Sequence, residues 1–258
     1  MQIFRLVLLI QVGFVWPPGS PRQQPVGRTC LPSPGGITVS VNDDRITAEG
    51  ERAPVAEAAA VSPIADPAPL GLAAFALTTF LLSAANAGWM GKATGDAWLG
   101  YAFAYGGLAQ LLAGMWEFRN KNVFGSTAFG SYGAFWIGLG LWELLVARVR
   151  PAGVLPVVYA GQTVKDLGWI LLAWAIFNTY MLLMATQLNT AVFAVFLTLE
   201  VTEVILFIGF FTGSSGTIKA GGYVGIVTAV VAWYTSAAGV ANGVPGPVKL
   251  PVGPPLLT

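Results

Sequence analysis

Six long stretches in the last three quarters of this chain are almost free of charged residues. They are residues 70–90, 97–116, 128–147, 167–188, 190–211 and 220–240. At 1.5 Å per residue, a helix of this length crosses a hydrocarbon core about 30 Å thick. A backbone in lipid must satisfy its own hydrogen bonds, and an α-helix does so within a single segment. The sequence therefore predicts an all-α integral membrane protein with six transmembrane helices, an even number that leaves both chain ends on one side.

Composition narrows the classes of function. Charged residues make up 10% of the 258 residues, whereas about a quarter is usual in soluble domains, and the mean hydropathy is +0.68. The net charge of +1 offers no basic face to a nucleic acid. The chain contains no His and a single Cys, Cys30, which excludes histidine-based zinc sites, Ser-His-Asp triads and an internal disulfide. We therefore expect no metal, no cofactor and no enzymatic activity.

The beginning of the chain has a different composition. Pro, Gly, Ser and Ala dominate residues 17–66, charges are scattered among them, and no helical or strand period is visible. This composition is typical of disorder, and the apolar run before it is too short to span a membrane. We expect a disordered tail over residues 1–66, with translation starting near Val41 as one hypothesis. A six-helix transmembrane domain over residues 67–242 and a short C-terminal tail over residues 243–258 would follow.

The charges in the predicted loops do not decide the orientation in the membrane. Arg119 and Lys121 lie on the side of the chain ends, and five basic residues lie on the other side. Those five are Lys92, Arg148, Arg150, Lys165 and Lys219. The positive-inside rule counts basic residues in short loops, and here it gives an ambiguous result.

A proline-rich motif precedes the first predicted helix. It reads Asp66-Pro67-Ala68-Pro69-Leu70-Gly71-Leu72. Asp is a good N-cap because its carboxylate accepts hydrogen bonds from the free N–H groups of the first turn. Pro is tolerated there because its missing N–H is not needed. The positive end of the helix dipole can also attract an anion.

Two further motifs lie in the second and third predicted helices. One is Tyr105-Gly106-Gly107-Leu108-Ala109-Gln110, and the other runs from Asn122-Val123-Phe124-Gly125-Ser126 to Ser131-Tyr132-Gly133-Ala134-Phe135-Trp136. Together with the proline-rich motif, they resemble the acetate uptake transporter family over residues 66–253. The first motif of that family begins with Asn, so Asp66 is a departure from it.

The resemblance implies a fold, an assembly and a substrate. The implied fold has six helices around a pore in each protomer, and six protomers form a homo-hexamer. Both chain ends face the cytoplasm, and the protein lies in the inner (plasma) membrane. The implied partners are acetate, succinate, protons and the lipid bilayer. The apolar constriction of the family falls on Phe75, Tyr132 and Leu199, with Leu197 as the alternative to Leu199.

Uncharged polar residues within the predicted spans agree with a pore for small weak acids. Thr79 and Asn86 follow Phe75 at helical spacing and share its face. Gln110 and Ser131 supply polar groups on the next two predicted helices. Hydroxyl and amide groups can replace part of the hydration shell of a carboxylate without binding it as strongly as Lys or Arg would. The alternative is that Ser and Thr bond to carbonyls of their own helix.

Acidic residues are unusual inside a membrane span, where each costs about 2.5–3.5 kcal/mol. Glu203 follows Leu199 by four residues and shares its face, whereas Glu200 points about 100° away. We expect Glu203 to be a protonatable residue of the pore that links flux to pH, with a structural hydrogen bond as the alternative. For Glu117, next to Arg119, we expect a solvated position at the pore mouth or an ion pair, with cation or proton handling as the alternative.

The sequence thus predicts a membrane transporter or channel for acetate and succinate, coupled to protons, that passes the carboxylate through a narrow apolar constriction. One alternative is a pore for small neutral solutes such as urea or undissociated acids. Another is a sensor that binds acetate without transporting it.

Overall fold

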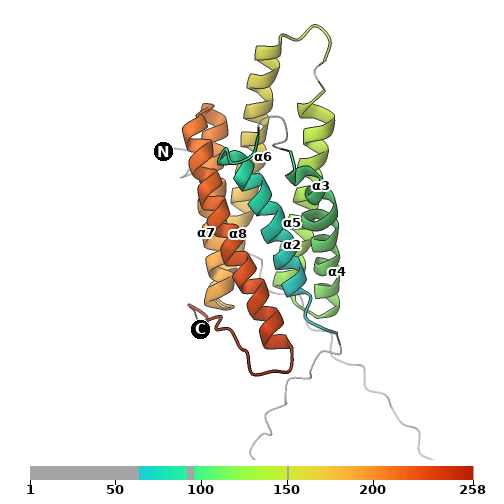
Figure 1. The fold of residues 1–258 in the computed structure, drawn as a ribbon, viewed down its shortest axis with the longest axis vertical. Helices are drawn as coiled ribbons and strands as arrows, with labels where there is room; N and C mark the ends of the chain where they lie inside the picture. Colours follow the sequence, from blue (N-terminus) through green and yellow to red (C-terminus); the bar gives the residue numbers. More distant parts are fainter. Residues whose placement is uncertain (1–63, 92–95, 150, 258) are drawn as a thin grey trace, which may run out of the picture. The chain divides into compact units, whose positions relative to one another are not determined.

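The computed structural model of the protein describes residues 64–91, 96–149 and 151–257 (Figure 1). Within these ranges the regular structure is helical and no strand occurs, so the predicted all-α class is confirmed. The predicted tail over residues 1–66, with the hypothetical start near Val41, lies outside the described residues except for its last three.

Five helices of the described residues are long and apolar enough to cross a membrane. They are α2 (Ala68–Asn86), α5 (Val123–Trp142) with its continuation η2 (Glu143–Ala147), α6 (Pro156–Ala185), α7 (Thr190–Thr212) and α8 (Ser215–Gly243). Each of them overlaps one of the six predicted stretches. The protein is therefore a multi-pass membrane protein.

The remaining predicted stretch, residues 97–116, is helical but is not one continuous α-helix. α3 (Trp98–Phe103), η1 (Ala104–Ala109) and α4 (Gln110–Arg119) follow one another without a break. The turns of η1 are widened to the π form, which usually occurs as a short insert in an α-helix. A side chain at Gly107 would collide with the carbonyl oxygen of Ala102, so the widened turn depends on glycine.

α6 is longer than the sequence predicted. It begins at Pro156, before the charge-free stretch, and therefore includes Lys165 and Asp166. Its 30 residues correspond to about 45 Å, which exceeds the thickness of the hydrocarbon core. Proline suits this first turn because the N–H that it lacks would have no partner there. The charged first part of α6 can thus lie beyond the hydrocarbon while the rest spans it.

Polar side chains fix the starts of three helices. Asp66 accepts a hydrogen bond from the N–H of Ala68 at 2.9 Å, but the N-cap position of α2 is taken by Pro67, one residue later than predicted. Asn122 caps α5 by accepting from the N–H of Gly125 at 3.0 Å, and Asn189 caps α7 in the same way. α2, α5 and α7 run in the same direction through the bundle (Figure 1). Residues that are equally far from these caps therefore lie at comparable depth.

Helices that are neighbours in the bundle approach each other closely at glycines. α2 packs along α8, α8 along α7, α7 along α6, and α4 along α5, whereas α5 and α6 meet at few residues. A side chain at Gly222 of α8 would collide with the backbone of Ala87 and Ser83. Gly114 of α4 lies in the same way against the backbone of Gly130. Such close approach is the usual role of small residues between membrane helices.

The residues after α8 form an ordered segment, which we call the C-terminal strap (residues 244–257). Its backbone turns back from the end of α8 toward the turn between α6 and α7 (Figure 1). There the N–H of Ala191 donates to the carbonyl of Val252 at 2.8 Å, and the N–H of Leu256 donates to Thr186 at 2.8 Å. Lys249 donates to three carbonyls at the end of α8. The strap thereby ties α8 to the adjoining ends of α6 and α7.

Candidate functional site

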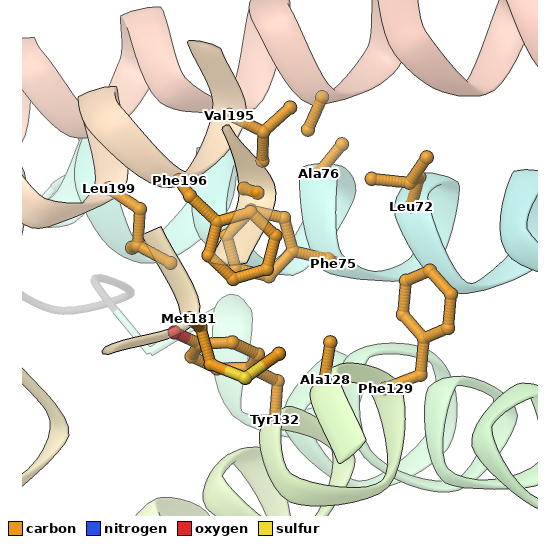
Figure 2. Close-up of a cluster of buried hydrophobic side chains, with 12 residues drawn as sticks. Leu72, Phe75, Ala76, Ala128, Phe129, Tyr132, Met181, Val195, Phe196 and Leu199 are labelled. Carbon is orange, nitrogen blue, oxygen red and sulfur yellow. The ribbon is translucent and has the colours of Figure 1, made fainter. Parts of the chain in front are cut away.

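Phe75 of α2, Tyr132 of α5 and Leu199 of α7 belong to a single cluster of buried side chains (Figure 2). Their exposed fractions are 5%, 3% and 7%. The ring centroids of Phe75 and Tyr132 are 5.8 Å apart, with the rings tilted by 59°. Leu197, the alternative to Leu199, is 42% exposed. The structure thus brings the three predicted constriction residues together, and Leu199 rather than Leu197 faces the others.

Further aromatic side chains close the space around Tyr132. The rings of Trp174 and Phe177, both on α6, have centroids 5.4 Å from that of Tyr132, and Phe196 of α7 lies at 6.3 Å. These three residues were not among those predicted from the sequence. The spacing of Trp174 and Phe177 places them on one face of α6, but spacing alone could not indicate that this face meets Tyr132.

A small cavity of about 20 Å³ lies on the side of the constriction toward the starts of α2, α5 and α7. It has room for about one water molecule. The lining includes all three constriction residues and Gln110, and it is otherwise formed by Leu72, Ala128, Phe129, Val195 and Phe196. The amide of Gln110 is 1% exposed, and within the described residues its Oε1 has no hydrogen-bond partner.

A second cavity of about 50 Å³ lies toward the ends of the same helices. Leu82, Leu139 and Leu206 line it, and each follows a constriction residue by seven positions, or two helical turns. The predicted pathway residue Asn86 also lines this cavity, together with Glu143. The constriction thus separates two small, mostly apolar spaces along one direction through the bundle.

Arg148 lies just beyond this second cavity. It forms an ion pair with Asp96 and another with Glu143 Oε1 at 3.3 Å. The hydrogen bond to Asp96 raises the pKa of Arg148 above its usual value. The part of the chain that the structure describes contains no other ion pair between side chains.

On the same three helices as the constriction, three buried side chains carry a polar atom that has no hydrogen-bond partner in the described part of the chain. The atoms are Thr79 Oγ1, Trp136 Nε1 and Glu203 Oε2. Each residue follows a constriction residue by four positions, on α2, α5 and α7 respectively. We call this set the polar layer. It lies one helical turn beyond the constriction.

The polar layer bears on two expectations from the sequence. The hydroxyl of Thr78 donates to Ala74 at 3.1 Å, within its own helix, but no such bond is found for Thr79 among the described residues. The second expectation concerns Glu203, whose side chain is buried within the bundle and is 5% exposed. The alternative of a helix-internal bond therefore describes Thr78, and Thr79 keeps a hydroxyl available to another group.

Glu200 has a different environment from Glu203. Its two carboxylate oxygens accept hydrogen bonds from Asn178 Nδ2 at 2.7 Å and from Thr179 Oγ1 at 2.8 Å, both on α6. This agrees with the expected orientation of Glu200 away from the face of Leu199. Ser131 lies beside Tyr132 on α5 but lines neither cavity.

The expectation for Glu117 is wrong. Its side chain is fully buried rather than solvated, and it takes part in neither of the ion pairs described above. The carboxylate lies against the start of α5, where a side chain at Gly125 would be 2.6 Å from Glu117 Oε1. The amides of Asn122 and Asn120 are near it, and the burial of Glu117 depends on this close packing of α4 against α5.

The fold and this site define an α-helical multi-pass membrane protein with a closed aromatic constriction between two small cavities. The chain belongs to the GPR1/FUN34/yaaH family, which matches residues 48–254.

Curated relatives and a solved structure agree with this assignment. Ammonia transport outward protein 2 of Saccharomyces cerevisiae is 42% identical over 187 residues, which are 71% of this chain and 64% of the relative. The succinate-acetate/proton symporter SatP of Escherichia coli is 33% identical over 190 residues, which are 74% of this chain and 96% of the relative. The structure of the bacterial acetate channel SatP superposes with a TM-score of 0.64 at 33% identity, covering 74% of this chain and 99% of that one.

The two SatP proteins confirm the resemblance that the three motifs indicated. The chain spans somewhat less than two thirds of the length of the yeast relative.

Proposed function

We propose that this protein carries acetate across a membrane through the constriction of Phe75, Tyr132 and Leu199, and that succinate is a second substrate of the same path. The observation that carries the proposal is the closed apolar constriction between two cavities in a protein similar to a succinate-acetate/proton symporter and an acetate channel. In the structure the constriction is sealed by buried aromatic side chains. Passage therefore requires the side chains to move apart around a carboxylate that has lost part of its water.

The polar layer offers hydrogen bonds to such a ligand. Hydroxyl and indole N–H groups can donate to carboxylate oxygens, as Thr79 and Trp136 would, without holding the ligand as a buried Lys or Arg would. Glu203 would repel an ionised carboxylate, but its oxygen can accept a hydrogen bond from an undissociated acid. The proposal is therefore that the carboxylate and a proton pass this layer together, as the undissociated acid, with Glu203 as the protonatable residue.

The proposal extends to topology and assembly. α3, η1 and α4 together would form the sixth span, since they are helical without interruption from Trp98 to Arg119. Both chain ends would then lie on one side, and we assign that side to the cytoplasm and the protein to the inner (plasma) membrane. Each protomer would have its own pore within a homo-hexamer, as the family resemblance implies.

Uptake of labelled acetate into proteoliposomes tests the function. Undissociated acetic acid crosses lipid unaided, so empty liposomes are measured beside those that contain the full-length protein. We expect saturable uptake above the empty liposomes, increased by an inward proton gradient and competed by succinate. If no excess is seen at any pH, the transport proposal is wrong.

Replacing Glu203 with Gln tests the proton coupling. Gln keeps the size of the side chain and its hydrogen bonding but cannot ionise. We expect saturable acetate uptake by Glu203→Gln to lose its stimulation by an inward proton gradient. Asp166→Asn, which removes an exposed acid from the charged part of α6, is the matched control and should retain it. An unchanged response in Glu203→Gln would exclude Glu203 as the coupling residue.

A pore for small neutral solutes is a second candidate. The observation in its favour is that neither cavity, as lined by described residues, includes Lys or Arg. The name of the yeast relative refers to ammonia transport. Urea and methylamine flux in the same proteoliposomes, without competition by acetate, would favour this candidate over the first.

A further inference from the structure

Tyr132 is connected to a chain of buried hydrogen bonds that the constriction itself does not explain. Its hydroxyl donates to Asn178 Oδ1 at 2.7 Å. Asn178 Nδ2 in turn donates to Glu200 Oε2 at 2.7 Å and to the carbonyl of Phe196 at 3.0 Å. The chain thus runs from α5 through α6 to α7.

Every polar atom of the Asn178 side chain takes part in these contacts. It is fully buried, both hydrogens of its amide are donated, and its oxygen accepts from Tyr132. A carboxylate can only accept hydrogen bonds, so Glu200 requires the nitrogen of the amide on its side. The orientation of the amide is thereby fixed, and its oxygen is left to face Tyr132.

Glu200 is held from a second direction as well. The hydroxyl of Thr179 has one hydrogen and two acceptors within 2.8 Å, Glu200 Oε1 and the carbonyl of Ala175. Glu200 thus bridges two successive residues of α6, and it fixes the position of the Asn178 amide relative to α7. We call Asn178, Thr179 and Glu200 the latch.

The latch fixes the direction of the Tyr132 hydroxyl, which the other contacts of Tyr132 do not fix. The ring packs against Phe75, Trp174 and Phe177, and such packing resists compression but has little directional preference. The hydrogen bond to Asn178 is directional. When Tyr132 swings aside, this bond breaks and leaves a buried amide oxygen without a partner, which opposes opening.

We propose that Asn178, anchored by Glu200 and Thr179, holds Tyr132 in the closed constriction and thereby limits the size of the carboxylate that passes. The latch residues are positioning residues, since they act through Tyr132 rather than on the ligand. This inference rests on the proposed transport function for its effect on selectivity, but the coupling of Asn178 to Tyr132 can be measured without transport.

The selectivity experiment compares acetate with butyrate in proteoliposomes of full-length variants. We expect Asn178→Leu, Tyr132→Phe and Thr179→Val to raise the ratio of butyrate to acetate Vmax/KM by about two- to tenfold, the effect of losing one hydrogen bond. Thr198→Val is the matched control, because the Thr198 hydroxyl bonds only to carbonyls of its own helix among the described residues. A structural defect would lower both rates together and leave the ratio unchanged.

The coupling experiment measures the thermal midpoint of unfolding in detergent for Tyr132→Phe, Asn178→Leu and the double variant. If the two residues act as one unit, the double variant loses no more stability than the larger of the two single losses. Additive losses would contradict the latch, whether or not the protein transports acetate. If the wild type and the variants all transport acetate but the butyrate-to-acetate ratio does not change, the latch has no role in selectivity. The transport proposal would remain intact in that case.

Discussion

Replacing Phe75 with Trp is expected to slow saturable acetate uptake strongly while leaving the protein folded. Phe75 lines a cavity that holds about one water molecule and packs against Tyr132, so a second ring has no space except the path itself. Overpacking of this kind costs about 1–3 kcal/mol, and the same barrier added to passage slows it roughly 5- to 150-fold. Uptake into proteoliposomes, corrected for empty liposomes, measures the loss.

Phe80→Trp is the control for this prediction. Phe80 lies on the same helix, but its ring packs against Trp233, which is 37% exposed. A larger ring there has room at the outer face of the bundle, and uptake should stay close to that of the unmodified protein. If Phe75→Trp transports as well as Phe80→Trp, the ligand does not pass this constriction.

The second large effect is expected on folding. Gly222→Ala should lower the free energy of unfolding by about 1–3 kcal/mol, the usual cost of overpacking. A single methyl group at this position collides with the backbone of Ala87 and Ser83, which cannot move aside as a side chain can. The thermal midpoint in detergent and the yield of monodisperse protein measure the change.

The same substitution at Gly138 provides the comparison. Gly138 also lies within a long helix, α5, but no atom lies within 4 Å of an added methyl group among the described residues. Because Ala favours a helix over Gly by up to about 1 kcal/mol, Gly138→Ala should match or exceed the unmodified stability. Equal losses in the two variants would show that helix propensity, and not the approach of α8 to α2, sets the result.

The helical type of the structure and the places of five spans could be predicted well, because charge-free stretches in lipid have one structural solution. Two details could not. The start of α6 was missed because Lys165 and Asp166 interrupt the apolar pattern, although a helix continues through them. The widened turns of η1 depend on how Gly107 meets the backbone of its own helix, and residue spacing does not report this contact.

The site was predicted unevenly. Phe75 and Tyr132 could be placed from the family motifs, whereas no motif flanks Leu199 and Leu197 was its alternative. The structure brings Phe75, Tyr132 and Leu199 together. Asn178 could not be placed, although it is one of few strongly polar residues in its span, because its role depends on the packing of α6 between Tyr132 and Glu200. Glu117 was placed in solvent because it lies next to Arg119, whereas the close packing of α4 and α5 buries it.

The C-terminal strap has a mechanical consequence for this arrangement. It binds the first turn of α7 through Ala191, so that end of the helix acts as a pivot. Leu199 lies about 12 Å along the helix from this pivot, and Phe210, which lines the second cavity, lies about 28 Å from it. A tilt of α7 therefore displaces Phe210 more than twice as far as Leu199, so the second cavity changes its width more than the constriction does.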